Sequence, residues 1–297
     1  MHEAAVLETP SGKAATEENF PVTGLLLPAR LRPHIEAFYA YARTIDDIAD
    51  NPYLRPSDKL RRLNQFAWAA SGVDTANPAL RRAHDVRHSL AATAVTRRHC
   101  IDLTKAFKLD QVKSRYRDWN DLMGYCNLSA APVGRYLIDL HGESDATYPH
   151  SDALCNALQV LNHLQDCRED YKSLDRVYLP QNWMTEAGIG VEELNRVQSS
   201  TALRQVFDRC LDATDGLMDL ARGLPDKFKN HRFAMDAAII VNIAGTLSSE
   251  LRRRDPLAER VALTRLQYSV CCARGIGRVL FSRLRRLASG GDRARAG

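Results

Sequence analysis

Two segments of the sequence place polar side chains at the spacing of one helix face. In the first, from about Ala29 to Asp50, the residues Tyr39, Arg43, Asp46 and Asp50 follow one another at steps of three or four. At 3.6 residues per turn, these four side chains lie within about 60° of one another. One face of this predicted helix therefore presents a phenol, a guanidinium and two carboxylates.

The second segment, from about Ser151 to Lys172, repeats this arrangement with different polar groups. Gln159, Asn162, Asp166 and Asp170 follow at steps of three and four and span about 80° of one predicted helix. Leucines occupy the opposite side of the same segment. The six residues that follow it, 175–180, are predicted to form a turn or a short helix end.

Carboxylates spaced four residues apart on a helix repel each other, so their repetition asks for an explanation. One explanation is Mg²⁺, which prefers oxygen ligands and is usually held by one or two carboxylates together with substrate phosphates. The alternative is that both are ordinary solvated faces, and spacing alone leaves the two open. A di-iron site would require Glu-x-x-His pairs, which are absent, so His163 is interpreted as a surface or core histidine. The predicted metal ligands are Asp46, Asp50, Asn162, Asp166 and Asp170, with Arg43 facing the phosphate oxygens.

Composition narrows the class of protein. Of 297 residues, 45% are hydrophobic and 26% charged, which is typical of a globular protein. The net charge of +5 is too small to indicate nucleic acid as a partner. Seven cysteines without a CxxC spacing argue against a disulfide framework or a structural zinc site, and favour a reducing cytosol. No signal peptide or membrane span is evident, so we expect a cytoplasmic protein that is soluble or peripheral.

Helix-length blocks separated by Gly, Pro and Asn fill most of the chain, and alternating strand patterns are scarce. We therefore expect one all-α domain over residues 19–288. Residues 1–18 are predicted to be a flexible lead-in and residues 289–297 a flexible tail.

The segment Ala40–Asp50 resembles the first Asp-rich motif of the squalene/phytoene synthases, and Asn162–Tyr171 resembles their second. Arg176–Pro180 follows at the distance typical of that family, and Tyr125-Cys126 with Val133-Gly134 is similar to its central motif. The resemblance covers nearly the whole chain and weakens past about residue 230.

The resemblance is closer to one branch, the hydroxysqualene synthases of bacterial hopanoid biosynthesis. Asn19–Val22, Ser129–Gly134 and Leu164–Cys167 carry this closer similarity. Gln165 departs from squalene and phytoene synthases, which usually have Arg at that position. One fewer Arg should weaken the hold on a second diphosphate and favour a substrate with one. Glu259-Arg260-Val261 is a weak match to a diphosphate-binding Arg of the family.

The resemblance implies a class I isoprenoid synthase, an all-α helical bundle around a central apolar cavity. It implies a Mg²⁺-dependent lyase that ionises presqualene diphosphate, a prenyl diphosphate, and captures the rearranged cation with water. Tyr39, Tyr125 and Tyr178 are candidates for orienting diphosphate or water and for shielding the cation, although each could be a plain core aromatic. The residues assigned to the substrate are Arg43, Arg176, Arg260 and Gln165.

Alternatives to this interpretation remain open. The enzymatic one is a head-to-head synthase that condenses two prenyl diphosphates, and a different class is a non-catalytic family member acting as an assembly factor. The basic amphipathic segment 274–286 could lie on an anionic membrane, although a last helix with a solvated basic face is favoured. A place among hopanoid-pathway enzymes would bring those enzymes as partners.

Overall fold

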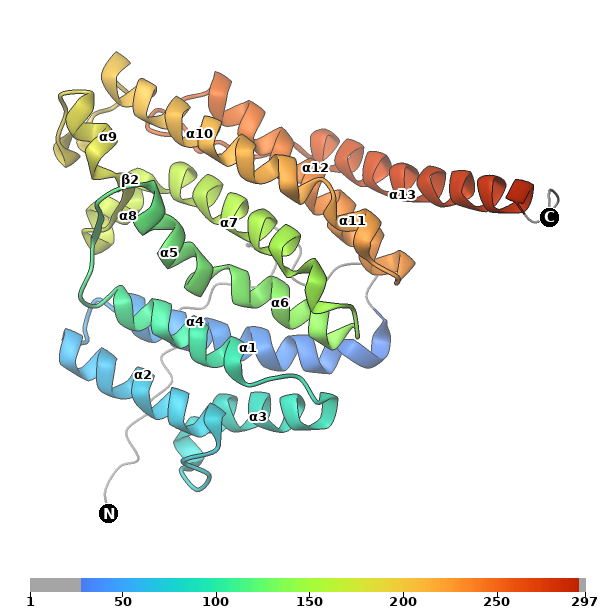
Figure 1. Ribbon diagram of the computed structural model, residues 1–297. Helices are drawn as coiled ribbons and strands as arrows, with labels where there is room; N and C mark the ends of the chain where they lie inside the picture. Colours follow the sequence, from blue (N-terminus) through green and yellow to red (C-terminus); the bar gives the residue numbers. More distant parts are fainter. Residues whose placement is uncertain (1–27, 294–297) are drawn as a thin grey trace.

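The computed structural model describes residues 28–293, with side chains as far as Arg285, and is almost entirely helical (Figure 1). The predicted lead-in, the segment Asn19–Val22 and the last four residues lie outside the described part. The all-α prediction is confirmed. The main helices are α1 (Arg32–Asp50), α2 (Pro56–Ser71), α3 (Arg81–Thr93), α4 (Arg98–Leu109), α5 (Trp119–Ser129), α6 (Ala131–Leu140), α7 (Tyr148–Gln165), α8 (Cys167–Leu174), α9 (Gln181–Glu186), α10 (Thr201–Ala221), α11 (Leu224–Lys227), α12 (His231–Arg253) and α13 (Arg265–Arg293).

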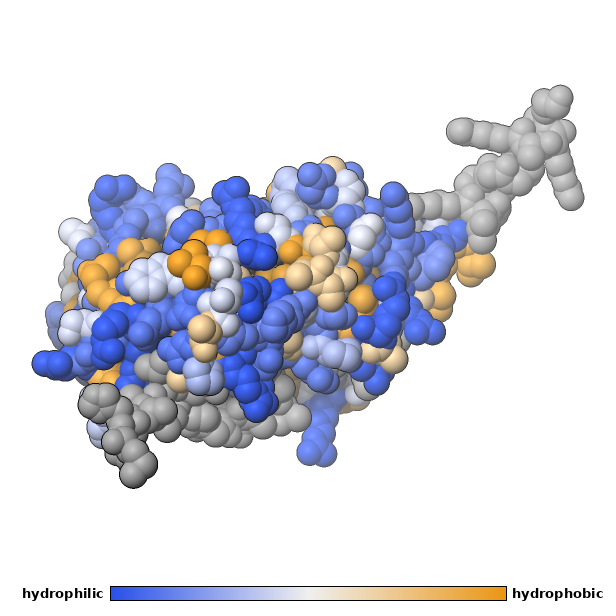
Figure 2. Space-filling model, turned by 90° about the horizontal axis from the view of Figure 1, so that it is seen from below, coloured by the Kyte–Doolittle hydropathy of each residue, from blue (hydrophilic) through white to orange (hydrophobic). Residues whose placement is uncertain are grey.

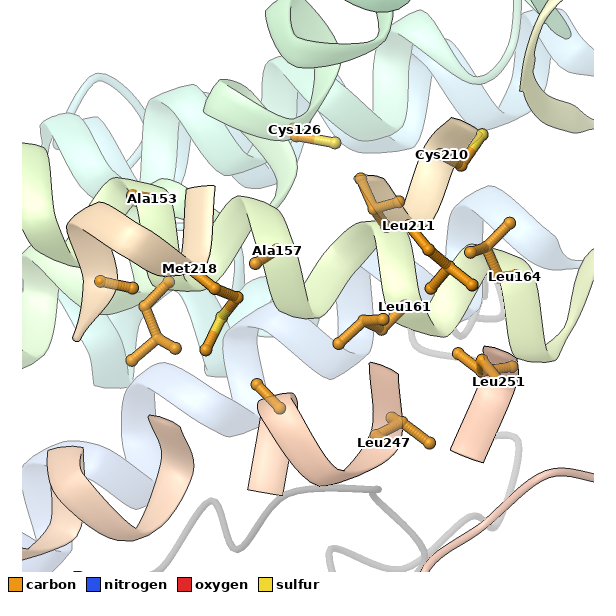
Figure 3. Close-up of a cluster of buried hydrophobic side chains, with 14 of the residues drawn as sticks. Cys126, Ala153, Ala157, Leu161, Leu164, Cys210, Leu211, Met218, Leu247 and Leu251 are labelled. Carbon is orange, nitrogen blue, oxygen red and sulfur yellow. The ribbon is translucent and has the colours of Figure 1, made fainter. Parts of the chain in front are cut away.

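Helix α7 is central to the bundle, because α5, α6, α10 and α12 all pack against it. Figure 3 shows Leu161 and Leu164 of α7 facing Leu211 of α10 and Leu247 of α12. A second apolar cluster holds α1, α2, α3 and α4 together. Burial of such side chains at roughly 25 cal/mol per Å² stabilises both clusters. The first motif lies on α1, beside the second apolar cluster, and the second motif lies on α7 and α8, beside the cluster around α7.

The predicted helix from Ala29 to Asp50 is confirmed, with a 3-10 turn over Ala29–Leu31 before α1. Its buried stripe includes Ile35, Phe38 and Ile45, as the periodicity predicts. The helix ends at Asn51, which has extended backbone and precedes a proline.

The prediction of one continuous helix over Ser151–Lys172 is wrong. Helix α7 begins at Tyr148 and ends at Gln165, Asp166 has non-helical backbone angles (φ −103°, ψ 7°), and α8 begins at Cys167. The backbone N–H of Asp166 still donates to the Asn162 carbonyl at 2.9 Å, so α8 follows after a kink rather than a loop. Asp166 is therefore at a junction, and the arithmetic for a single 80° stripe does not hold across it.

The prediction of a turn or helix end at 175–180 is also wrong. Asp175 takes the left-handed conformation (φ 50°) and terminates α8, and the chain then forms strand β2 (Val177–Pro180). Strand β2 pairs in parallel with β1 (Arg115–Tyr116). Asn and Asp are the non-glycine residues that best tolerate such a positive φ.

Helix α13 extends past the rest of the bundle (Figure 1) and runs to Arg293, five residues beyond the predicted domain end. Within the described residues, none of the helices combines the length and apolarity needed to cross a bilayer. The face shown in Figure 2 is mostly hydrophilic, with hydrophobic patches between the polar side chains.

Candidate active site

The first predicted polar face is present on α1. The Arg43 guanidinium pairs with Asp46 at 2.9 Å and with Asp47 at 3.2 Å. The sequence placed Asp47 beside the stripe rather than on it, yet its side chain is more buried than that of Asp46. Tyr39 is half-buried one turn before Arg43. Arg43 therefore neutralises part of the negative charge on this face of α1.

Arg176 connects the two predicted motifs. Its backbone N–H donates to the carbonyl of Asp170 at 3.1 Å, and its Nη1 donates to Oδ1 of Asp50 at 2.7 Å. Arg176 is buried, whereas the Asp50 side chain is 38% exposed. Arg176, the residue before β2, thus holds a cation at the end of α1, where the first and second motifs meet.

The acidic residues of the second motif differ in their surroundings. Asn162 is half-buried in the last turn of α7, Asp166 is exposed at the kink, and Asp170 is half-buried in the first turn of α8. A carboxylate in the first turn of a helix is stabilised by the helix dipole, typically by 0.3–1 kcal/mol. Asp170 thus lies where its own backbone carbonyl meets the backbone N–H of Arg176.

Tyr125 and Tyr178, both predicted site residues, are neighbours, with ring centroids 5.4 Å apart. A third tyrosine, Tyr116, lies 5.3 Å from the Tyr125 ring and 5.5 Å from the Tyr178 ring. The pairing of β1 with β2 brings Tyr116 and Tyr178 together, and α5 supplies Tyr125. Burial raises the pKa of Tyr125 and Tyr178 well above the usual value, so both phenols keep their protons.

Asp110, which the sequence did not predict, lies at the hydroxyl groups of two of these tyrosines. Its carboxylate accepts hydrogen bonds from the Tyr125 hydroxyl at 3.0 Å and the Tyr178 hydroxyl at 3.4 Å. Burial raises the pKa of Asp110 to about 7, and the positive charge of Arg176 opposes that rise. Asp110 belongs to no helix-face pattern, because its partners come from residues 15 and 68 positions away.

His163 is also part of this cluster rather than an isolated histidine. Its imidazole stacks on the Tyr178 ring, with centroids 3.6 Å apart and planes 10° from parallel. A ring nitrogen lies 3.2 Å from the Gln159 amide nitrogen, and the other lies 3.9 Å from an Asp170 oxygen. His163 therefore joins α7 to the tyrosines and to the second motif.

Gln165 faces a different part of the molecule from the tyrosines. Its side chain is buried, and its amide nitrogen donates to the backbone carbonyl of Val261. This bond holds the connection between α12 and α13 against the end of α7. Arg260 is next to Val261 in that connection, and its side chain is exposed. The structure thus brings the Arg260 segment to the second motif through Gln165.

The donors of the two motifs fit a hard divalent cation in kind. They are carboxylate and amide oxygens, without a thiolate, and such ligands suit Mg²⁺. Within residues 28–293, no three His, Cys, Asp or Glu side chains gather closely enough to hold a metal by themselves. A Mg²⁺ ion bound partly by substrate phosphates needs only one or two carboxylates from each motif.

Comparison with known proteins adds an independent finding. Residues 13–267 match the family model described as squalene/phytoene synthase. The chain is 40% identical over 263 residues to a hydroxysqualene synthase of Rhodopseudomonas palustris, and 39% identical over 253 residues to one of Zymomonas mobilis. The matches cover 89% of both chains in the first case and 84% in the second.

A solved structure has a similar fold. It is described as a squalene synthase from Alicyclobacillus acidocaldarius and superimposes with a TM-score of 0.70 at 28% identity. The match covers 80% of this chain and 90% of that one. The predicted fold class, a class I isoprenoid synthase bundle, is confirmed by this likeness together with the helical architecture.

Proposed function

Because the chain belongs to the squalene/phytoene synthase family, we propose that it is a hydroxysqualene synthase. It ionises presqualene diphosphate, breaking the carbon–oxygen bond so that diphosphate leaves with the electron pair. The cyclopropylcarbinyl cation rearranges, water adds to it, and a proton is lost to give a C30 alcohol. The single observation that carries the proposal is the link through Arg176, which joins the Asp50 end of one motif to Asp170 of the other.

The proposed site residues fall into three sets. Arg43 and Arg176 attract the diphosphate, and preorganised positive charge stabilises the departing anion. Tyr39, Tyr125 and Tyr178 orient diphosphate or water and shield the cation with their ring faces. Gln165, tied to Val261, and the exposed Arg260 complete the substrate-binding set on the side of the α12–α13 connection.

Mg²⁺ is the proposed cofactor. Asp46 and Asp50 would hold it from α1, and Asn162, Asp166 and Asp170 would hold it from α7 and α8. When bound, the ion supplies positive charge to the leaving group. Without it, the carboxylates of both motifs repel a diphosphate, so substrate binding should require the metal.

The test is a product assay with purified protein, Mg²⁺ and no reductant. Presqualene diphosphate and farnesyl diphosphate are supplied in separate tubes, and the extract is read by mass spectrometry. A C30 alcohol from presqualene diphosphate alone, carrying ¹⁸O when the reaction is run in ¹⁸O-labelled water, supports the proposal. Consumption of farnesyl diphosphate favours a head-to-head synthase instead, and inactivity with both substrates favours a non-catalytic assembly factor.

We propose further that α13 carries the enzyme to the inner surface of the cytoplasmic membrane, where a water-insoluble product can be released to lipid and to other hopanoid-pathway enzymes. Leu266, Leu280, Phe281 and Leu284 are each at least half exposed on this helix. Arginines flank these apolar side chains, and the segment from Arg265 to Gly291 contains no acidic residue. Such a pattern suits an anionic bilayer, whereas two equally basic helices would repel each other.

Vesicle sedimentation tests the membrane proposal separately from activity. The protein should sediment with vesicles containing anionic lipid and remain in the supernatant with zwitterionic ones. The Phe281→Ser and Leu284→Ser double variant should lose sedimentation and keep turnover of detergent-dispersed substrate. Equal sedimentation of the variant would contradict the membrane role. So would a wild-type protein that forms a dimer through α13 and does not bind vesicles.

A further inference from the structure

Asp110 is a carboxylate in a place where carboxylates are rare. It ends helix α4, directly after Leu109, and only 8% of its surface is exposed. Acidic side chains are almost never buried unless they are paired, because burial costs several kcal/mol without compensating hydrogen bonds. Its presence under the tyrosine cluster therefore indicates a function for the group that a neutral residue would not serve.

The two oxygens of Asp110 are divided between two phenols. Oδ2 accepts from the Tyr125 hydroxyl, and Oδ1 accepts from the Tyr178 hydroxyl. Tyr116, the third ring of the cluster, has a buried hydroxyl that makes no hydrogen bond in the structure. Only Tyr125 and Tyr178, of these three tyrosines, bond the carboxylate, and both also lie next to His163.

A positive charge makes this arrangement electrostatically tolerable. Arg176 acts on Asp110 through its charge and at the same time donates to Asp50. Burial raises the pKa of Asp110 to about 7. Above that pH the carboxyl group is ionised, with a nearby guanidinium and two hydrogen-bond donors as its partners. The network therefore runs from the first acidic motif through Arg176 to Asp110 and on to the phenols.

We propose that Asp110 is a positioning residue that fixes the direction of the Tyr125 and Tyr178 hydroxyl protons. Above pH 7 the ionised carboxylate of Asp110 only accepts hydrogen bonds, so both phenols must point their protons at it. The assays below are therefore run at pH 8 or higher. Their remaining lone pairs then face away from Asp110. Of the two roles proposed above for these tyrosines, this leaves Tyr125 and Tyr178 to orient water and stabilise the carbocation, because their protons are engaged by Asp110 and not offered to diphosphate. The proposal rests on the function proposed above, because it assigns these oxygens to the cation step.

The Asp110→Asn variant tests this proposal with almost no change in shape. An amide offers one acceptor and one donor group, so one of the two phenols must reverse its hydrogen bond and turn its proton away. We expect kcat for presqualene diphosphate to fall by about 100-fold, as when one preorganised group is lost from an active site. KM should change by less than about threefold, since Asp110 does not touch the diphosphate.

A combined variant distinguishes positioning from a general structural role. If Asp110 acts through the phenols, adding Asp110→Asn to the Tyr125→Phe and Tyr178→Phe pair should cause no further loss of kcat. Independent contributions would instead multiply. Multiplying losses, or an Asp110→Asn enzyme within threefold of the wild type, would overturn the proposal.

Asp139→Asn is the matched control. Asp139, on α6, also accepts hydrogen bonds from a tyrosine, Tyr148, and from His99, but it lies outside the cluster formed by the three tyrosines and His163. This variant should keep kcat within about twofold of the wild type.

A measurement without substrate separates this proposal from the proposed function. The hydroxyl protons of Tyr125 and Tyr178 can be observed by NMR and assigned by their loss in the two Phe variants. We expect Asp110→Asn to shift at least one of these signals and Asp139→Asn to shift neither. Unchanged signals would overturn the positioning role even if the enzyme is active. Shifted signals in a protein that acts on neither diphosphate would support the positioning and count against the function alone.

Discussion

Arg176 and Asp50 form an ion pair at 2.7 Å although 126 residues separate them in the sequence. The pair joins the beginning of β2 to the end of α1, the two places where the acidic motifs approach each other. Because the guanidinium also acts on buried Asp110, its removal would leave two carboxylates without their shared cation.

Replacing Arg176 with Gln should therefore lower both stability and turnover. We expect the free energy of unfolding to fall by about 1–3 kcal/mol, because solvent screens the exposed Asp50 whereas buried Asp110 loses its neighbouring cation. Product formation should be lost as well. Urea unfolding and the product assay measure the two effects. Arg204→Gln is the control, since Arg204 bonds Asp208 and the Leu251 carbonyl away from the site, and should retain full activity per folded molecule.

Diphosphate binding should depend on Mg²⁺. With the metal chelated by EDTA, calorimetry should detect no binding of inorganic diphosphate and no product should form, and added Mg²⁺ should restore both. Asp50→Asn should weaken the metal-dependent binding at least tenfold. Asp208→Asn, on α10, should not change it. Tight binding of diphosphate in EDTA would show that the arginines suffice.

The free energy of unfolding should depend on pH through the titration of Asp110. Burial raises the pKa of Asp110 to about 7, so the folded state retains a proton that the unfolded state has released above pH 4. As the pH rises from 4 to 7, the wild type should therefore lose stability relative to Asp110→Asn. The difference should reach at most about 4 kcal/mol. Urea titrations of both proteins at several pH values measure it, and parallel curves would contradict the prediction.

Loss of the Gln165 amide should loosen the connection between α12 and α13. Gln165→Leu leaves the carbonyl of buried Val261 without this donor, which typically costs about 1–2 kcal/mol. We expect that decrease in the free energy of unfolding and faster proteolysis within 255–264. Gln111→Leu, whose partly buried amide donates to the Ala49 and Phe107 carbonyls away from this connection, should not speed proteolysis within 255–264. Equal effects would mean that Gln165 is not a tether.

Gly134, part of the central motif, should tolerate no side chain. A Cβ atom there would lie 2.3 Å from Oγ of Ser151 and 2.6 Å from Sγ of Cys155, where α6 crosses α7. Gly134→Ala should therefore destabilise the fold by about 1–3 kcal/mol. Gly124→Ala, in α5 with open space at its Cβ position, should be neutral or stabilising by up to about 1 kcal/mol. Thermal unfolding of the two variants tests this contrast.

The parts of the site that the sequence predicts are those set by local periodicity. Helix α1 places Arg43 and Asp46 on one face because their spacing matches the helical turn, and the structure pairs them. The same reasoning failed at Asp166, because a single non-helical residue changes the direction of every side chain after it. Periodicity contains no information about such a kink.

Asp110, Tyr116 and the role of His163 could not be predicted for a different reason. Each depends on partners from other elements: Tyr178 reaches Asp110 across 68 residues and Tyr116 through the pairing of β1 with β2. A single Asp at the end of a helix or a single His on a helix usually has an ordinary structural role. Only the packing of α4, α5, α7 and β2 distinguishes these residues from ordinary ones.

The pairing of β1 with β2 has a consequence for the synthesis of the protein. Arg115 aligns with Val177, so this contact cannot form until the ribosome has released the intervening 61 residues together with β2. Closing so long a loop carries an entropic penalty that only the packing of the helices between the strands can offset. The cluster of Tyr116, Tyr125 and Tyr178 can therefore assemble only after β2 has been synthesised. A nascent chain that stops before Val177 would contain both acidic motifs but neither β2 nor Tyr178, so the tyrosine cluster would still be incomplete.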